Sequence, residues 1–134
     1  MTTFQLTIVA PDRTVVDEVT DSVSAPGVQG YFGVWAGHEP FVTQLKPGVV
    51  AYNDAAGKTQ YVAVAGGFLE AAGDHVIILA DAAEAQRDID IERARAALER
   101  AKKRLEAIGE GVDAERARAA ADRAMARIMV AEKR

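Results

Sequence analysis

The chain of 134 residues carries 20 acidic against 16 basic residues, a net charge of −4, and it contains no cysteine. This length supplies one modest hydrophobic core and leaves little room for two large domains. The lack of cysteine excludes a disulfide framework, a thiolate metal site and a cysteine nucleophile. The first residues lack the cationic start of a signal peptide, and no run reaches the roughly 18–20 apolar residues of a membrane span. We therefore expect a soluble, intracellular protein.

Short alternating stretches dominate the first 85 residues. Phe4, Leu6 and Ile8 alternate with polar neighbours, which is the period of a half-buried strand. Seven further short runs follow, separated by glycine and proline turns, and no helix-length periodic segment lies between them. Strands of this length and spacing favour an antiparallel arrangement over a parallel sheet. The sequence therefore predicts an antiparallel β-sandwich, or flattened barrel, over residues 1–86.

Composition changes near residue 87. Residues 1–89 carry eleven acidic against four basic residues, whereas residues 90–134 carry nine against twelve, a net charge of +3. All four prolines lie before residue 90, as does every glycine except Gly109 and Gly111. Both observations predict a second domain over residues 87–134.

Two apolar stripes at steps of three and four residues predict two helices in this second domain. The stripes consist of Ile91, Ala94, Leu98, Ala101, Leu105 and Ile108, and of Ala114, Ala117, Ala121, Ala124, Ile128 and Ala131. Gly109 is a C-terminal stop and Asp113 an N-cap, so residues 109–112 are the expected turn of an antiparallel two-helix hairpin. Each methylene buried by such an alanine seam is worth only about 0.8 kcal/mol, so the hairpin is a candidate for movement.

Arginines recur along both predicted helices. A turn at residues 109–112 would bring them to matching levels, with Arg93 beside Arg127 and Arg100 beside Arg123. Adjacent guanidinium groups repel unless an anion or carboxylates neutralise them. Arginine forks suit phosphate oxygens, at about 1.5–3 kcal/mol per charge-assisted hydrogen bond. The alternative is an ordinary solvated surface, which the i,i+4 pairs Glu99–Lys103 and Arg118–Asp122 favour.

Four motifs follow one another along the chain: PGVQGYFGVWAGHEPFVTQLKPGVV at residues 26–50, VAGGFLEA at 64–71, VIILADAAE at 76–84, and an Ile-Asp-x-x-Arg-Ala stretch at Ile89–Ala94. Together they resemble the epsilon subunit of the proton-translocating, F-type ATP synthase, essentially from end to end. The resemblance implies a rotor subunit that joins the gamma subunit to the c ring and performs no chemistry itself. It also implies that the hairpin either folds back on the sandwich or extends along gamma toward the alpha and beta subunits and inhibits ATP hydrolysis.

The same resemblance implies a location at the cytoplasmic face of the bacterial inner membrane, or alternatively at the stromal face of the thylakoid. Membrane contact would then occur only through the complex. It implies no obligatory cofactor, but ATP as a regulatory ligand, because the folded-back hairpin of some bacterial members binds ATP. The matching positions are Glu84, Ile89, Asp90, Arg93, Ala94, Arg100, Arg123 and Arg127. Asp90 would accept the adenine amino group, or it serves as the N-cap of the first helix.

One segment departs from the family pattern. Residues 29–33 read QGYFG where family members commonly carry EGELG, so Tyr31 replaces a carboxylate in the loop expected to face the c ring. Tyr31, Phe32 and Trp35 offer an aromatic anchor in its place. The alternative is that Phe32 and Trp35 belong to the sandwich core, which we favour for Phe32. The expected contacts to the c ring or gamma are Tyr31, Phe32, Gly33 and His38.

Other classes have less support. AAGKT at residues 55–59 lacks the first glycine of a phosphate loop, which would fall at Tyr52, and is predicted to be a hairpin turn. The two histidines, His38 and His75, are too isolated for a metal site or a catalytic triad. A free-standing ATP-sensing regulator using the same arginines remains an alternative. The acidic β domain opposes nucleic-acid binding.

Overall fold

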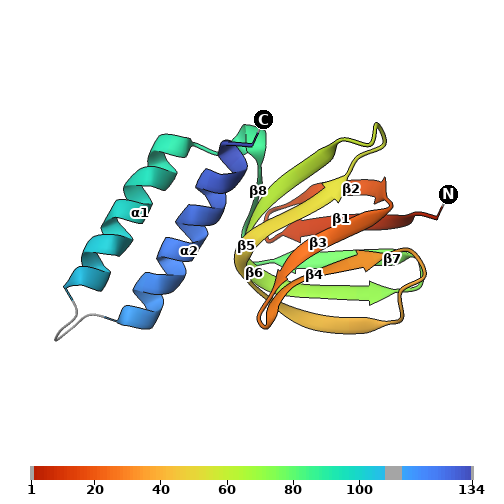
Figure 1. Ribbon diagram of the computed structural model, residues 1–134, viewed down its shortest axis with the longest axis horizontal. Coiled ribbons are helices and arrows are strands. Elements are labelled where there is room, and N and C mark those ends of the chain that lie inside the picture. Colours follow the sequence, from red (N-terminus) through yellow and green to blue (C-terminus); the bar gives the residue numbers. More distant parts are fainter. Residues whose placement is uncertain (1, 108–112, 134) are drawn as a thin grey trace.

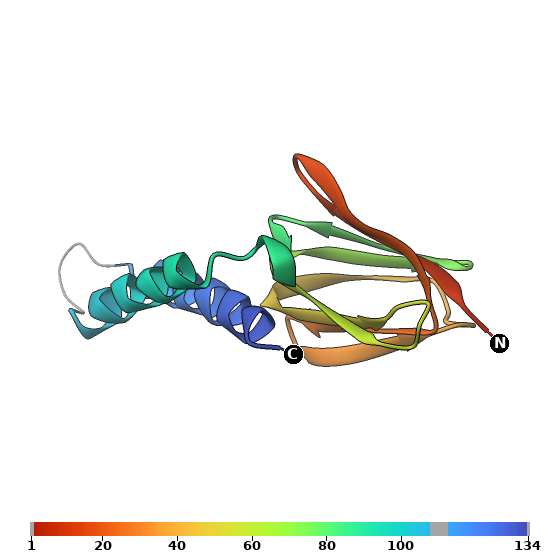
Figure 2. The ribbon, with the colours of Figure 1, turned by 90° about the horizontal axis from the view of Figure 1, so that it is seen from above.

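The computed structural model describes residues 2–107 and 113–133, so the predicted turn with Ile108 and Gly109 lies outside the described residues. The first part of the chain is one sheet folded over on itself into a sandwich (Figures 1 and 2). Its strands are β1 (Phe4–Ala10), β2 (Arg13–Thr20), β3 (Ser22–Gly27), β4 (Gly30–Trp35), β5 (Phe41–Asn53), β6 (Thr59–Ala72), β7 (His75–Ala80) and β8 (Ala83–Ala85). The predicted sandwich is confirmed.

The strand order is β2-β1-β7-β6-β5-β3-β4, with β8 paired to β6, and the path does not close into a barrel. Neighbours are antiparallel except β1 and β7, which run parallel with Leu6 opposite Val76. The predicted antiparallel arrangement therefore holds for every pair of strands except β1 and β7. Alternation reports which face of a strand is buried, but not which distant strand lies beside it, so no local pattern indicates this pairing.

Strands β5 and β6 are long and bend from one layer into the other. Glycine and proline were expected to separate the short runs, but β5 continues through Pro47-Gly48, with Pro47 opposite Ala65. The bend falls at Gly66 and Gly67, whose φ angles are +113° and +132°. A Cβ atom on Gly67 would lie 2.0 Å from the carbonyl oxygen of Leu79, so only glycine allows β6 to turn this close to β7.

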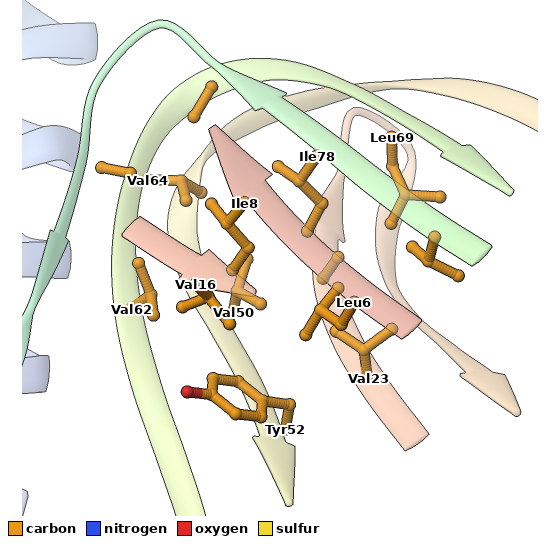
Figure 3. Close-up of a cluster of buried hydrophobic side chains, with 14 of the residues drawn as sticks. Leu6, Ile8, Val16, Val23, Val50, Tyr52, Val62, Val64, Leu69 and Ile78 are labelled. Carbon is orange, nitrogen blue, oxygen red and sulfur yellow. The ribbon is translucent and has the colours of Figure 1, made fainter. Parts of the chain in front are cut away.

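The main core lies between the two layers of the sandwich. Figure 3 shows side chains from several strands pointing toward one another, and Leu6, Ile8, Val50, Leu69 and Ile78 are each 0% exposed. Burying such aliphatic side chains away from water is the main favourable term in folding.

The second part is a short 3₁₀ turn η1 (Gln86–Asp88), helix α1 (Ile91–Glu106) and helix α2 (Ala114–Ala131). The two helices form the predicted hairpin, and α2 lies between α1 and the sandwich (Figure 1). The seam between the helices buries the predicted alanines Ala94, Ala101, Ala117, Ala121 and Ala124, whereas Leu98 and Leu105 are only half-buried. Within the described residues, neither helix is long and apolar enough to cross a membrane.

Helix α2 docks on the outer surface of β5 and β6 through a small apolar contact. Ala126 and Val130 of α2 pack against Val49 and Ala63. We call these four residues the docking contact. The neighbouring strand residues face the opposite way into the main core, so both surfaces of the bent β5–β6 pair are buried at this point.

Ile78→Ala is expected to lower the free energy of unfolding by about 2–5 kcal/mol, because the side chain is fully buried and its removal leaves a cavity. Urea unfolding followed by circular dichroism measures this change. Ile77→Ala is the matched control, since Ile77 points to the other face of β7 and is only half-buried. Equal losses in the two variants would contradict this assignment of the core.

Candidate functional site

Residues 86–90, between β8 and α1, form the linker from the sandwich to the hairpin. A cavity of about 380 Å³ lies where this linker meets the two helices, and we call it the arginine cavity. It is lined by Glu84, Asp88, Asp90, Arg93, Ala94, Ala97, Arg100 and Arg127. These residues come from β8, from η1 and the residues after it, and from both helices. A ligand held here would therefore touch the linker and the hairpin together.

The helical repeat sets the α1 wall of the cavity. Arg93, Ala97 and Arg100 are separated by steps of four and three and so share one face of the helix. Alanines between the arginines leave room for a ligand that larger side chains would fill. Ala97 was not predicted as a site residue, although its spacing from Arg93 places it on this face.

Asp90 is the N-cap of α1, which confirms one of the two roles considered for it. Its Oδ1 atom accepts a hydrogen bond from the backbone N–H of Arg93 at 3.1 Å. Asp113 caps α2 in the same way, accepting from the N–H of Arg116 at 3.0 Å. A carboxylate at a helix N-terminus satisfies an unpaired donor and complements the helix dipole.

The strongest ion pair of the site joins Glu84 to Arg127. The Arg127 Nε atom donates to Glu84 Oε1 at 2.5 Å, and both side chains are about one-third exposed (29% and 31%). A hydrogen bond between charged groups is shorter and stronger than a neutral one. An anion that binds Arg127 must therefore displace or share this carboxylate.

Two other arginines of the cavity, Arg93 and Arg100, have no carboxylate within ion-pair distance among the described residues. Asp88 instead pairs with Arg13 of β2 at 3.8 Å, and Arg13 also donates to the carbonyl of Ala83 at 3.5 Å. The cavity thus presents two free guanidinium groups beside a third that is held by Glu84.

The structure brings together six of the eight residues expected around ATP: Glu84, Asp90, Arg93, Ala94, Arg100 and Arg127. Arg123 does not line this cavity with Arg100 as expected; it lines a small adjoining one with Glu84 and Arg127, because it lies on the side of α2 turned toward β6. Ile89 lies outside both cavities and packs on the docking contact. Sequence reasoning missed Asp88 and Arg13, which meet through a 3₁₀ turn that no periodicity signals.

The solvated pairs considered as an alternative are not formed. Within the described part of the hairpin, the ion pairs of Arg95 are with Glu92 at 3.0 Å and Glu132 at 4.0 Å, and neither Glu99–Lys103 nor Arg118–Asp122 is found. The arginine cavity is therefore not neutralised by pairs along the helices.

The AAGKT segment is the predicted hairpin turn between β5 and β6. Asp54 Oδ1 accepts from the N–H groups of Ala56 and Lys58 at 2.9 Å, and Gly57 takes a φ of +79°. A side-chain hydrogen bond from Gln60, together with the backbone hydrogen bonds from Lys58 and Ala56, lowers the pKa of Asp54.

Near this turn, Tyr52 is a second group with a shifted pKa. Burial, and then the hydrogen bond to Glu18, raise the pKa of Tyr52 above its usual value. No three acidic or histidine side chains among the described residues meet as a metal site.

The predicted partner residues occupy β4 and the loop after it. Tyr31 is 56% and Trp35 64% exposed, so Trp35 is not a core residue. Tyr31 accepts a hydrogen bond from the N–H of Val49 at 2.9 Å. Phe32 packs partly buried on the core, which confirms the alternative favoured for it.

Gly33 and His38 complete this region. The Trp35 indole covers Gly33, where a Cβ atom would lie 2.6 Å from the ring. His38 meets the ring of Phe4 edge-on at 5.7 Å, and neither buried ring nitrogen has a hydrogen-bond partner among the described residues. We call the exposed pair Tyr31 and Trp35 the aromatic face.

A second exposed apolar surface was not predicted. Val42, Phe68 and Leu79 are 65%, 52% and 53% exposed, and Phe68 is directly opposite Leu79 in the register of β6 and β7. They lie on the outer side of the sandwich layer that contains β7, and we call them the outer apolar face. Alternation predicts that one face of each strand is exposed, but not that apolar residues from three strands gather there.

Family models match the whole length of this architecture. Residues 3–86 match the β-sandwich domain, and residues 87–132 the long α-helix domain, of the ATP synthase delta/epsilon chain. The ATP synthase epsilon chain of Moorella thermoacetica is 48% identical over 131 residues, covering 98% of each chain. That of Anaeromyxobacter sp. strain K is 50% identical over 105 residues, covering 78% of this chain and 79% of the relative.

Solved structures agree. A chain in the Euglena gracilis mitochondrial ATP synthase structure, which contains OSCP, F1 and the c-ring, superposes with a TM-score of 0.79 at 27% identity, over 91% of this chain and 77% of that one. A chain in the central stalk and c-ring of the Tetrahymena thermophila enzyme shares the fold, with a TM-score of 0.54 at 13% identity over 94% and 91%. The chain therefore belongs to the ATP synthase delta/epsilon chain family, and the resemblance of its sequence to the epsilon subunit is confirmed.

Asp90→Ala is expected to destabilise the first turn of α1 by about 1 kcal/mol, because the capping acceptor is lost. Asp90→Asn keeps an acceptor of similar capping strength and should leave that turn nearly unchanged. Amide hydrogen exchange of residues 93–97 measures the difference. Equal protection in both variants would mean that the Asp90 cap contributes nothing in solution.

Proposed function

We propose that this chain is a rotor subunit of the ATP synthase, joining the gamma subunit to the c ring without catalysing a reaction itself. Its epsilon-chain relatives and the F1 and c-ring assembly that contains its structural neighbour support this role. The protein would be peripheral, held at the cytoplasmic face of the bacterial membrane by the complex. In a plastid, the corresponding location would be the stromal face of the thylakoid membrane.

The two exposed apolar surfaces give the rotor two docking sites. The outer apolar face is suited to the gamma subunit, because it exposes three apolar side chains on neighbouring strands. Phe68 is directly opposite Leu79, and Val42 pairs with Glu70, two residues from Phe68. The aromatic face is suited to the c ring, because Tyr31 stands where the family commonly has a carboxylate and Trp35 is exposed beside it. Burial of each patch contributes about 25 cal/mol per Å² of apolar surface.

Phe68→Asp is expected to weaken binding to the gamma subunit of the same organism by at least about tenfold, because a carboxylate would be desolvated in an apolar contact. Co-purification and titration with gamma measure this. Val19→Asp is the matched control: Val19 is also half-exposed, but it lies on β2 at the end of the sheet. Unchanged binding by Phe68→Asp would place the gamma contact on another surface.

We further propose that the arginine cavity binds ATP as a regulatory ligand. Its volume lies in the range of small-ligand pockets. Arg93 and Arg100 offer free guanidinium groups to the phosphates, and Arg127 joins them when Glu84 is displaced. Asp90 uses its Oδ1 atom for the helix cap, which leaves its Oδ2 atom as an acceptor for the adenine amino group.

ATP bound in this way would hold the hairpin on the sandwich. The ligand bridges the linker and both helices, so it binds the docked form and not an extended one, and stabilises it by mass action. When ATP is scarce, the hairpin would leave the sandwich and extend toward the alpha and beta subunits, where it inhibits ATP hydrolysis. The small area of the docking contact supports a low cost for this movement.

Arg93→Gln and Arg127→Gln are each expected to weaken ATP binding about 10- to 100-fold, the loss of one charge-assisted hydrogen bond. Calorimetric titration of the isolated protein with ATP and ADP measures this. Arg118→Gln is the matched control, since Arg118 is an exposed arginine of α2 outside both cavities that Arg127 lines. No heat up to millimolar ATP in the wild-type chain would mean that these arginines serve carboxylates of other subunits.

A further inference from the structure

The last residues of the chain are held by the linker. The Gln86 side chain, in η1, donates its Nε2 hydrogens to the carbonyl oxygens of Ala131, at 3.5 Å, and of Lys133. Figure 1 shows the C-terminal end beside this short helical turn, at the end of the hairpin that joins the sandwich. The contact connects residues 45 and 47 positions apart in the sequence.

The sandwich holds the same end by a different interaction. The Lys133 ammonium lies 4.8 Å from the centroid of the Tyr61 ring on β6. Tyr61 also packs on the docking contact, so the ammonium group lies over a ring whose position is set by that contact. An ammonium over an aromatic face is attracted by the negative potential of the ring.

Helix chemistry explains why this end needs partners. The last carbonyl groups of a helix have no partner within it, and they form the negative end of its dipole. The last turn of α2 contains no basic residue to complement that end. The amide of Gln86 supplies donors to the chain end, and Lys133 supplies the positive charge just beyond the helix.

We propose that Gln86 and Tyr61, acting on Ala131 and Lys133, form a C-terminal clamp that keeps the hairpin docked without any nucleotide. None of the four residues lines the arginine cavity. The docked state then depends on two separate devices, the clamp and the ATP site. The proposal shares with the proposed function only the premise that the docked hairpin exchanges with a released one.

If the clamp holds the hairpin, substitutions that remove its contacts should speed amide exchange in α2 but not in the sandwich. Lys133→Met keeps most of the aliphatic stem and removes the charge, and Gln86→Leu removes the donors at similar volume. Each is expected to speed amide exchange in α2 about threefold in nucleotide-free protein, and the double variant about tenfold. Strands β1 and β7 should keep their wild-type exchange, because the main core is untouched.

Hydrogen exchange followed by mass spectrometry on the full chain tests this directly. Lys102→Met is the matched control, since Lys102 is an exposed lysine of α1 that forms no ion pair within the described residues. Exchange in α2 that stays at the control value in the double variant overturns the clamp. An equal acceleration of α2 and the strands also overturns it, because the change would then be global.

A second measurement tests the contact between Lys133 and Tyr61. In Lys133→Met with Tyr61→Leu, the acceleration should be smaller than the product of the two single effects, since both remove the same contact. A full product overturns the assigned pairing. All of these measurements use protein without ATP, so failure of ATP to bind in the titration leaves them unaffected.

Discussion

The apolar contact between α2 and the bent β5–β6 pair is the constraint on which the functional part of this structure depends. Its buried residues are Val49, Ala63, Ala126 and Val130, with Tyr61 and Ile89 packed against them, and it determines where α2 lies on the sandwich. The walls of the arginine cavity come from β8, from residues 88 and 90, and from both helices, so its shape depends on where the hairpin lies against the sandwich. Because these walls belong to different parts of the chain, a ligand would meet all of them only when the hairpin is docked.

The arginine cavity is lined by three carboxylates and three arginines, but only some of them are paired. Glu84 holds Arg127 at 2.5 Å, and Asp88 is held by Arg13 from the other side of the linker. Arg93 and Arg100 keep their charge exposed. For the proposed anionic ligand, Arg93 and Arg100 would be available without displacing an ion-pair partner, whereas Arg127 would have to be shared with Glu84.

The β-sandwich contributes more than a platform. Val50 and Val62 point into the main core, while their neighbours Val49 and Ala63 point out to α2. A change in the packing of the core at the bend would therefore also shift Val49 and Ala63 in the docking contact. The glycines at 66 and 67 permit this bend, so the backbone geometry of β6 determines where the hairpin can dock.

The sequence by itself determined the elements and their chemistry. Alternation around Leu6 defined the strands, alanine periodicity defined the hairpin, and Asp90 and Asp113 defined its caps, because each of these signals is local. The motifs also determined the family and most residues of the arginine cavity. Only the tertiary structure decided the parallel pairing of β1 with β7, the Arg13–Asp88 pair, the gathering of Phe68 with Leu79, and the return of Lys133 to Tyr61. These contacts join residues far apart in the chain, and no periodicity records which distant side chains will meet.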